Sequence, residues 1–164
     1  MTDKKKSSKA LILTIAPVVL LLVGLLIAAA AVGWFNDPKV SLDPEYYCSD
    51  DCGEELLSLT GADYESLIKE KKSFIVLVDQ GGCTTADRLR EYASEFAKER
   101  GVKVYRLMFA EEKETSLHDL VKYYPSVAII SKGKPVAYLR ADSDADAPMY
   151  NNYDEFKKWM EKYL

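Results

Sequence analysis

Cys83 is the residue of this sequence whose position is most suggestive of chemistry. It lies in the stretch DQGGCTTADRLRE (79–91), after an apolar run and two glycines and before a helical pattern. A cysteine at the start of a helix meets unpaired backbone N–H groups and the positive end of the helix dipole, which favour the thiolate. A thiolate attacks disulfides, so the position predicts a nucleophile for disulfide exchange. The alternative is an inert, buried Cys83 in a turn made by Gly81 and Gly82.

The other two cysteines, Cys48 and Cys52, stand close together in CSDDC. A structural zinc site uses four ligands, and no histidine is near these two in the sequence, so we expect neither a metal nor a cofactor here. We predict a local Cys48–Cys52 disulfide that leaves Cys83 free. A further alternative stays open, in which Cys48 or Cys52 forms a disulfide with Cys83.

Two weaker polar patterns are interpreted as solvent-exposed. His118 is the only histidine and lies among charged residues, so we expect a solvated or capping role. Asp142, Asp144 and Asp146 resemble the start of a calcium loop, but the glycine and glutamate that such a loop needs further on are absent. We interpret that run as a solvated loop.

The elements that position Cys83 alternate between helices and strands. Apolar periodicity and turn residues predict, in order, a helix capped by Asp63, a strand at 74–78, a helix at 84–100, a strand at 102–109, a helix at 114–123, two strands in SVAIIS and PVAYLR, and a helix at 154–164. Lys132-Gly133-Lys134 marks the turn between the last two strands. The order predicts an α/β domain with a mixed central sheet.

Over residues 60–164 this pattern resembles the thioredoxin superfamily. Cys83 opens the long helix where that family has its nucleophile, Tyr124-Pro125-Ser126 is similar to the family's cis-proline loop, and KGKPVAYL is similar to its hairpin. The resemblance implies a thioredoxin-like fold and a cis Tyr124–Pro125 bond. It also implies that substrate contacts come from Gly82, Thr84, Tyr124, Pro125 and Ser126.

The sequence departs from the redox-active members of that family at three points. Ala86 stands where the second cysteine of the CxxC pair is expected, Leu77 occupies the position of the family's buried acid, and Gly82 precedes Cys83 where that family commonly has Trp. Asp79 is only four residues before Cys83, so it does not match that acid. The departures imply either a monothiol exchanger that needs an outside reductant, or a redox-inactive module that binds a peptide beside Pro125.

The N-terminal segment predicts a membrane anchor. Residues 10–33 carry no charge and are long enough to cross a bilayer as a helix, and four lysines precede them. We therefore expect a cytoplasmic tail at 1–9, a transmembrane signal anchor at 10–33, an extracytoplasmic linker at 34–59 and an extracytoplasmic domain at 60–164. A cleavable signal peptide is the alternative, because small residues occur at 29–31.

The charge of the chain bears on its partners. Residues 36–164 hold 18 Lys and Arg against 25 Asp and Glu, a net charge of −7. Such a surface repels phosphate backbones, so nucleic acid is not an expected partner. The expected partners are the thiols or disulfides of extracytoplasmic proteins or peptides, together with the membrane through residues 10–33.

Overall fold

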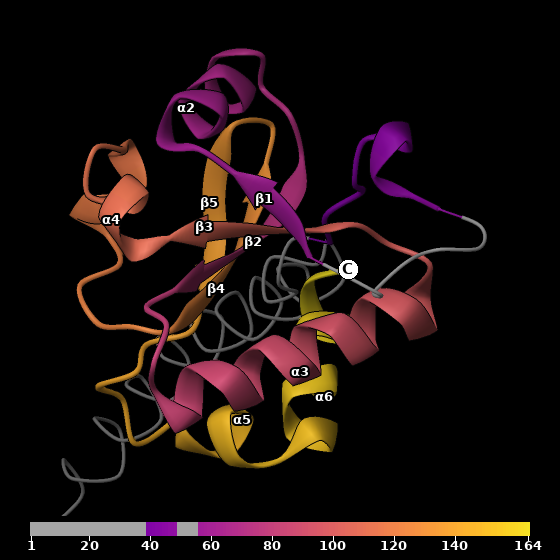
Figure 1. Cartoon of the computed structure of the whole chain (residues 1–164). Helices are drawn as coiled ribbons and strands as arrows, with labels where there is room; N and C mark the ends of the chain where they lie inside the picture. Colours follow the sequence, from indigo (N-terminus) through magenta and orange to yellow (C-terminus); the bar gives the residue numbers. More distant parts are fainter. Residues whose placement is uncertain (1–38, 49–55) are drawn as a thin grey trace, which may run out of the picture. The chain divides into compact units, whose positions relative to one another are not determined.

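A computed structural model describes residues 39–48 and 56–164 (Figure 1). Its elements are η1 (Pro44–Tyr46), β1 (Leu57–Leu59), α2 (Gly61–Lys69), β2 (Phe74–Asp79), α3 (Thr84–Arg100), β3 (Val104–Met108), α4 (Phe109–Glu112), η2 (Ser116–Asp119), β4 (Ser126–Ser131), β5 (Lys134–Tyr138), α5 (Ala147–Asn151) and α6 (Tyr153–Tyr163), where η denotes a 3-10 helix. The predicted order of helices and strands is confirmed from α2 onward, apart from the segment between β3 and β4 and the short helix α5, which was not predicted.

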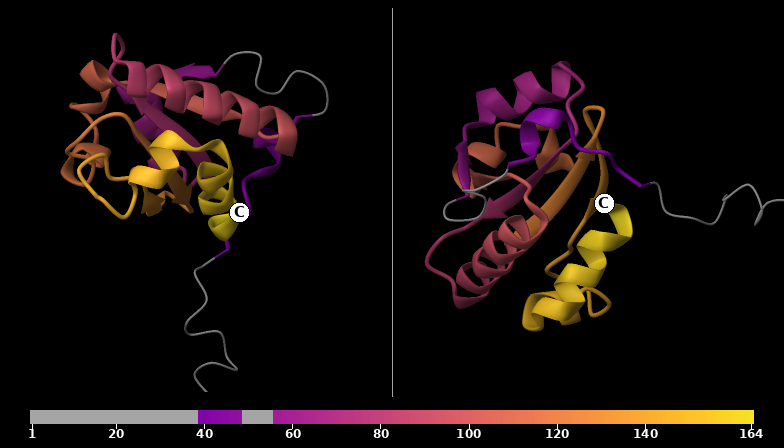
Figure 2. Two further views of the ribbon diagram at one scale, coloured as in Figure 1. Left: turned by 90° about the horizontal axis from the view of Figure 1, so that it is seen from below. Right: turned by 90° about the vertical axis from the view of Figure 1, so that its right-hand side faces the viewer.

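The strands form one mixed sheet in the order β1-β3-β2-β4-β5. β1, β2 and β3 are parallel, whereas β4 runs antiparallel to β2 and β5 antiparallel to β4. Helices α2 and α4 lie on one side of the sheet, and α3, α5 and α6 lie on the other (Figures 1 and 2). All six residues of β2 are buried, as expected for a central strand covered on both faces.

The ends of β2 and β3 and the start of β4 lie at one edge of this sheet. β2 ends at Asp79 and β3 ends at Met108, and these two residues are paired in the parallel register. β4 begins at the same edge, because Ser126 is paired with Val78 near the end of β2. Two segments therefore meet there, the loop 80–83 and the connection 109–125 that contains α4 and η2. We call this region the thiol edge.

Helix α3 has the bounds that the sequence predicts. Leu89, Ala93 and Phe96 are buried along one face, which packs toward the sheet and α6. The helix ends at Gly101, whose left-handed backbone (φ 61°) lets its N–H donate to the Ala97 carbonyl. Cys83 is the N-cap residue at the other end.

Helix α2 begins earlier than predicted. Its N-cap is Thr60 and not Asp63. The Thr60 hydroxyl accepts a hydrogen bond from the Asp63 backbone N–H at 3.1 Å and donates to the Asp63 carboxylate at 2.6 Å. Thr60 is therefore the N-cap, and the Asp63 carboxylate supports the first turn from inside the helix by accepting from the Thr60 hydroxyl.

The predicted helix at 114–123 is wrong. The segment forms only the 3-10 turn η2, and the short helix α4 precedes it. The Ser116 N–H, at the start of η2, donates to the Glu65 carboxylate of α2 at 2.6 Å, which satisfies one of the N–H groups that a helix start leaves unpaired.

The folded domain also extends further toward the N-terminus than residues 60–164. Val40, Leu42 and Tyr46 are buried in the core, and β1 adds an edge strand beside β3. The described residues of the predicted linker at 34–59 therefore pack as part of the domain, because their apolar side chains are buried against its hydrophobic core.

Among residues 39–48 and 56–164, no helix is long and apolar enough to cross a membrane. The predicted span at 10–33 lies outside the described residues.

Candidate thiol site

Cys83 is a free, half-buried cysteine at the thiol edge. The chain reaches it through Gly81 and Gly82, both of which have positive φ angles (69° and 63°). These angles belong to the left-handed region that glycine adopts without steric cost, so the two glycines turn the chain from β2 into α3. Cys83 itself has extended backbone, as an N-cap residue should.

The surroundings of the Cys83 sulfur favour the thiolate. The backbone N–H of Ala86, and after it that of Thr85, lower the pKa of the thiol below its ordinary value. Partial burial and the nearby Asp87 carboxylate act in the opposite direction without reversing the shift. Backbone N–H groups at the start of α3 thus favour the thiolate of Cys83, which is its nucleophilic form.

The second thiol of a dithiol motif is absent from this turn. Ala86 is fully buried, and it faces Cys83 with its backbone N–H. A disulfide formed by Cys83 with a partner would not be broken from within the turn.

A buried acid is nevertheless present, two residues after the position that the resemblance indicated. Leu77 and Asp79 lie on the same face of β2, since alternate residues of a strand share a face, and both are fully buried. One Asp79 oxygen accepts from the Gly81 N–H at 2.9 Å, and the other contacts Arg90 of α3 at 2.9 Å and Arg106 of β3 at 2.7 Å. The register of β2 thus places a carboxylate here that the resemblance did not indicate.

Asp79 is poorly suited to accept a proton. Burial raises its pKa, but the Gly81 N–H and the guanidinium groups of Arg106 and Arg90 outweigh burial and hold the pKa below the ordinary range. The carboxylate is therefore ionised and ties β2, α3 and β3 together beneath the loop that carries Cys83.

The second loop of the thiol edge carries Tyr124 and Pro125. The peptide bond between them is cis, as predicted. Tyr124 is half-buried, Pro125 is buried, and Ser126 is fully buried with its hydroxyl donating to the Leu139 carbonyl at 2.7 Å. The Ser126 side chain is thus turned into the fold, whereas Gly82 and Thr84 beside Cys83 are exposed.

Helix α5 connects the start of α3 to this loop. Arg88 of α3 donates to the Tyr150 carbonyl at 3.3 Å and to the Asn151 side-chain oxygen at 2.8 Å. The Tyr150 hydroxyl in turn donates to the Pro125 carbonyl at 2.9 Å. The first turns of α3 and the proline loop are therefore held against a common support.

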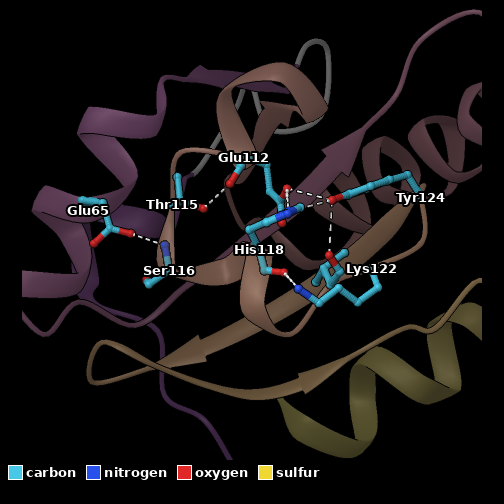
Figure 3. Close-up of polar contacts among 8 residues, drawn as sticks. Glu65, Glu112, Thr115, Ser116, His118, Lys122 and Tyr124 are labelled. Atoms are coloured by element: carbon cyan, nitrogen blue, oxygen red, sulfur yellow. Dashed lines mark hydrogen bonds and ion pairs between the residues drawn. The ribbon is translucent and has the colours of Figure 1, made fainter.

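A polar cluster formed by the buried Glu112 with the partly exposed His118 and Tyr124 adjoins the loop (Figure 3). The Tyr124 hydroxyl donates to Glu112 Oε2 at 2.8 Å, and His118 Nδ1 lies 3.1 Å from the same oxygen. Burial, followed by the hydrogen bond to Glu112, raises the pKa of the Tyr124 hydroxyl. The His118 side chain is partly solvated (39% exposed), as expected, but one ring nitrogen also contacts the fully buried Glu112 carboxylate, a contact that the sequence did not indicate.

The thiol edge also exposes apolar surface. The Met108 side chain is 36% exposed, and its Cε would lie 3.8 Å from a Cβ placed on Gly81. An exposed methionine beside the loop to Cys83 is suited to contact an apolar side chain of a partner.

Cys48 lies at the opposite end of α3. Its N–H donates to the Gly101 carbonyl at 3.0 Å, and the 17 residues of α3 separate this point from Cys83 by about 25 Å. Cys48 is disulfide-bonded, and its predicted partner Cys52 lies outside the described residues. The pairing stays a prediction, but Cys48 does not act as a resolving thiol for Cys83 in this fold.

Among the aspartates of the 142–146 loop, Asp146 has a structural contact. Asp146 accepts from the Arg140 N–H at 2.7 Å, while Asp142 and Asp144 are exposed. Within the described ranges, no group of three or more His, Cys, Asp or Glu side chains is arranged to hold a metal ion.

No protein-family model and no curated protein matches the chain. Solved structures do match. A mutant thioredoxin from Halobacterium salinarum NRC-1 has a TM-score of 0.53 and 14% identity, over 70% of this chain and 96% of that one. Reduced Schistosoma mansoni thioredoxin pre-protein has a TM-score of 0.52 and 17% identity, over 68% and 100%. Fasciola hepatica thioredoxin has a TM-score of 0.51 and 19% identity, over 66% and 100%.

At these identities the likeness establishes the fold. The described residues have a thioredoxin-like fold, with a mixed sheet between two layers of helices, a cysteine at the start of the long helix and a cis-proline loop at the same edge.

Proposed function

We propose that this chain is a membrane-anchored, extracytoplasmic thioredoxin-like protein in which Cys83, acting as a single thiol, exchanges with a partner disulfide and captures the partner as a mixed disulfide. The observation that carries the proposal is the free, half-buried Cys83 at the start of α3, with a pKa lowered by the N–H groups of Ala86 and Thr85. Partial exposure gives a partner access to the sulfur, and the lowered pKa increases the fraction of the nucleophilic thiolate at a given pH.

The chemical step is a thiol–disulfide exchange. The Cys83 thiolate attacks one sulfur of a partner disulfide, a new S–S bond forms, and the old one breaks to release the partner's second sulfur as a thiolate that takes a proton from water. Because Ala86 has no sulfur, the mixed disulfide persists until an external thiol attacks it. That attack restores Cys83 and leaves the partner disulfide-bonded to the external thiol.

A second candidate is a binding module without redox chemistry, which holds a peptide against the proline loop. Two observations favour it. The turn lacks a second thiol, and the buried Asp79 is neutralised by Arg90 and Arg106, so this carboxylate does not serve as a base for the exchange.

The experiment that separates the two is a pH titration of Cys83 alkylation in the full-length chain. Iodoacetamide labelling at Cys83, read by mass spectrometry of its peptide, should reach half its maximal rate at a pH below that of a free cysteine. Partner capture on non-reducing gels should disappear in Cys83→Ser and on adding dithiothreitol. Equal capture by both proteins, insensitive to reductant, would leave only the binding module.

The location outside the cytoplasm is part of the same proposal, supported by the uncharged segment 10–33 and the lysines before it. Protease added to intact cells or spheroplasts should digest the domain. Protection until the membrane is broken would overturn this topology.

A further inference from the structure

We infer that Glu112 and His118 are positioning residues for the proline loop, so that they govern the capture of peptide partners by Cys83 without changing its nucleophilicity. The inference rests on the proposed function, because it names what orients the partner at that same site. It gives a role to a polar cluster around the buried Glu112 that the thiol step leaves unused.

The cluster is built around a carboxyl group that has no access to solvent. Glu112 is fully buried, although it ends a short helix in a charged run. Its Oε2 receives the Tyr124 hydroxyl at 2.8 Å and faces His118 Nδ1 at 3.1 Å, while its Oε1 has no hydrogen-bond partner among the described residues. A buried polar group is costly when its bonds are lost, so both contacts with Oε2 should be strongly maintained.

Tyr124 is held by several contacts at once. Its hydroxyl lies 3.2 Å from His118 Nδ1 and 3.2 Å from the Val121 carbonyl, and its ring packs edge-on against Phe109 with centroids 4.8 Å apart. The Thr115 hydroxyl donates to the Glu112 carbonyl at 2.7 Å and stabilises the turn that presents the carboxylate. Such a constrained side chain fixes the backbone to which it is attached.

The position of that backbone decides what the cluster can influence. Tyr124 is bonded directly to Pro125, and the register of β2 with β4 puts this loop at the thiol edge with Cys83. The amides that lower the pKa of Cys83 belong to α3, which lies on the other side of the sheet from α4 (Figure 1). Loosening the loop should therefore alter how an extended peptide is held and leave the thiolate unchanged.

The test compares two disulfides that share a leaving group. In the full-length chain, Cys83 is reacted with Ellman's reagent, which is small, and with a ten-residue peptide whose single cysteine carries the same thionitrobenzoate group. Release of the coloured thiolate gives both rates. Tyr124→Phe, which removes only the hydroxyl, should lower the peptide rate about tenfold relative to the small-disulfide rate. The matched control Tyr47→Phe removes an exposed hydroxyl at the far end of α3 and should leave the ratio unchanged.

His118 provides a second variant in case Tyr124→Phe folds poorly. The His118 side chain is partly exposed, so His118→Ala should be tolerated, and it should lower the same ratio. His118→Asn should restore it, because the asparagine side-chain amide can donate to Glu112 from near the position of Nδ1. Circular dichroism melting curves check that each variant is folded.

The outcomes are distinguishable. A lowered peptide rate with an unchanged small-disulfide rate supports the inference. A ratio that is unchanged in both Tyr124→Phe and His118→Ala overturns it, as does an equal fall of both rates. If the wild type reacts with neither disulfide, the proposed function itself fails.

Discussion

Replacing Asp79 with asparagine tests whether the buried ionic network stabilises the domain. The Asp79 side chain is fully buried, and the substitution keeps an oxygen for the Gly81 N–H but removes the charge that pairs with Arg90 and Arg106. Breaking a buried ion pair costs about 3–5 kcal/mol. The two arginine side chains are about one-third exposed (32% and 36%) and keep some water, so we expect the lower end, about 3 kcal/mol.

For a folded unit of this size, that loss should lower the midpoint of thermal unfolding by about 10 °C, followed by circular dichroism. The lowered pKa of Asp79 also predicts how its stabilisation changes with pH. Because the folded-state pKa of Asp79 is lowered, its stabilisation is complete above the unfolded pKa and is lost as the pH falls through the folded value. The gap between wild type and Asp79→Asn should be widest near pH 7 and should narrow on acidification below about pH 4.

The control is Glu155→Gln, which removes one carboxylate from an exposed pair with Lys158 and should leave the midpoint within about a degree or two of the wild type. An Asp79→Asn protein that melts with the wild type at pH 7 would refute the ionic argument. A deficit of constant size from pH 7 to pH 3 would refute it as well, since it would arise from packing alone.

Three further changes have defined outcomes. Asp87→Asn removes a carboxylate that raises the pKa of Cys83, so iodoacetamide labelling of Cys83 at pH 7 should become faster, and a slower rate would contradict the electrostatic account. Ala86→Cys places a second thiol one turn after Cys83 and should give partial reduction of insulin with dithiothreitol as the final reductant, whereas unaided turnover by the wild type at a similar rate would show that the missing thiol is irrelevant. Gly133→Ala should destabilise the domain by several degrees in a melting curve, because the new Cβ would lie 2.3 Å from the Ile68 carbonyl oxygen at a φ of 73°; an unchanged curve would mean that the hairpin yields at no cost.

The parts of the fold with strong local signals could be predicted. Helix α3 has the expected bounds because an apolar stripe runs along it and Gly101 ends it. β2 is one residue longer than predicted, since Asp79 does not look like a buried strand residue until its two arginine partners are known. The candidate nucleophile Cys83 followed from the same local signals, namely the glycine turn and the start of a helix.

The parts of the fold and of the site that depend on tertiary contacts could not be predicted from the sequence. Glu112 stands in the run AEEKE, which has no feature to distinguish a buried carboxylate from solvated ones, and only the fold brings Tyr124 and His118 to it. The packing of the segment before β1 did have a signal, the alternation of Val40 and Leu42 around a serine. That pattern is too short to predict a core contact unless the surface it covers is known.

The first described residues of the chain contact the domain at the end of α3 that lies away from Cys83. Val40 donates its N–H to the Tyr163 carbonyl at 2.6 Å, the Lys39 side chain donates to the Glu161 carbonyl, and Glu161 pairs with Arg100 in the last turn of α3. The entry point is therefore about 25 Å from Cys83, at the other end of the same helix. A partner that reaches Cys83 at the thiol edge therefore does not have to break the contacts that Lys39 and Val40 make with α6.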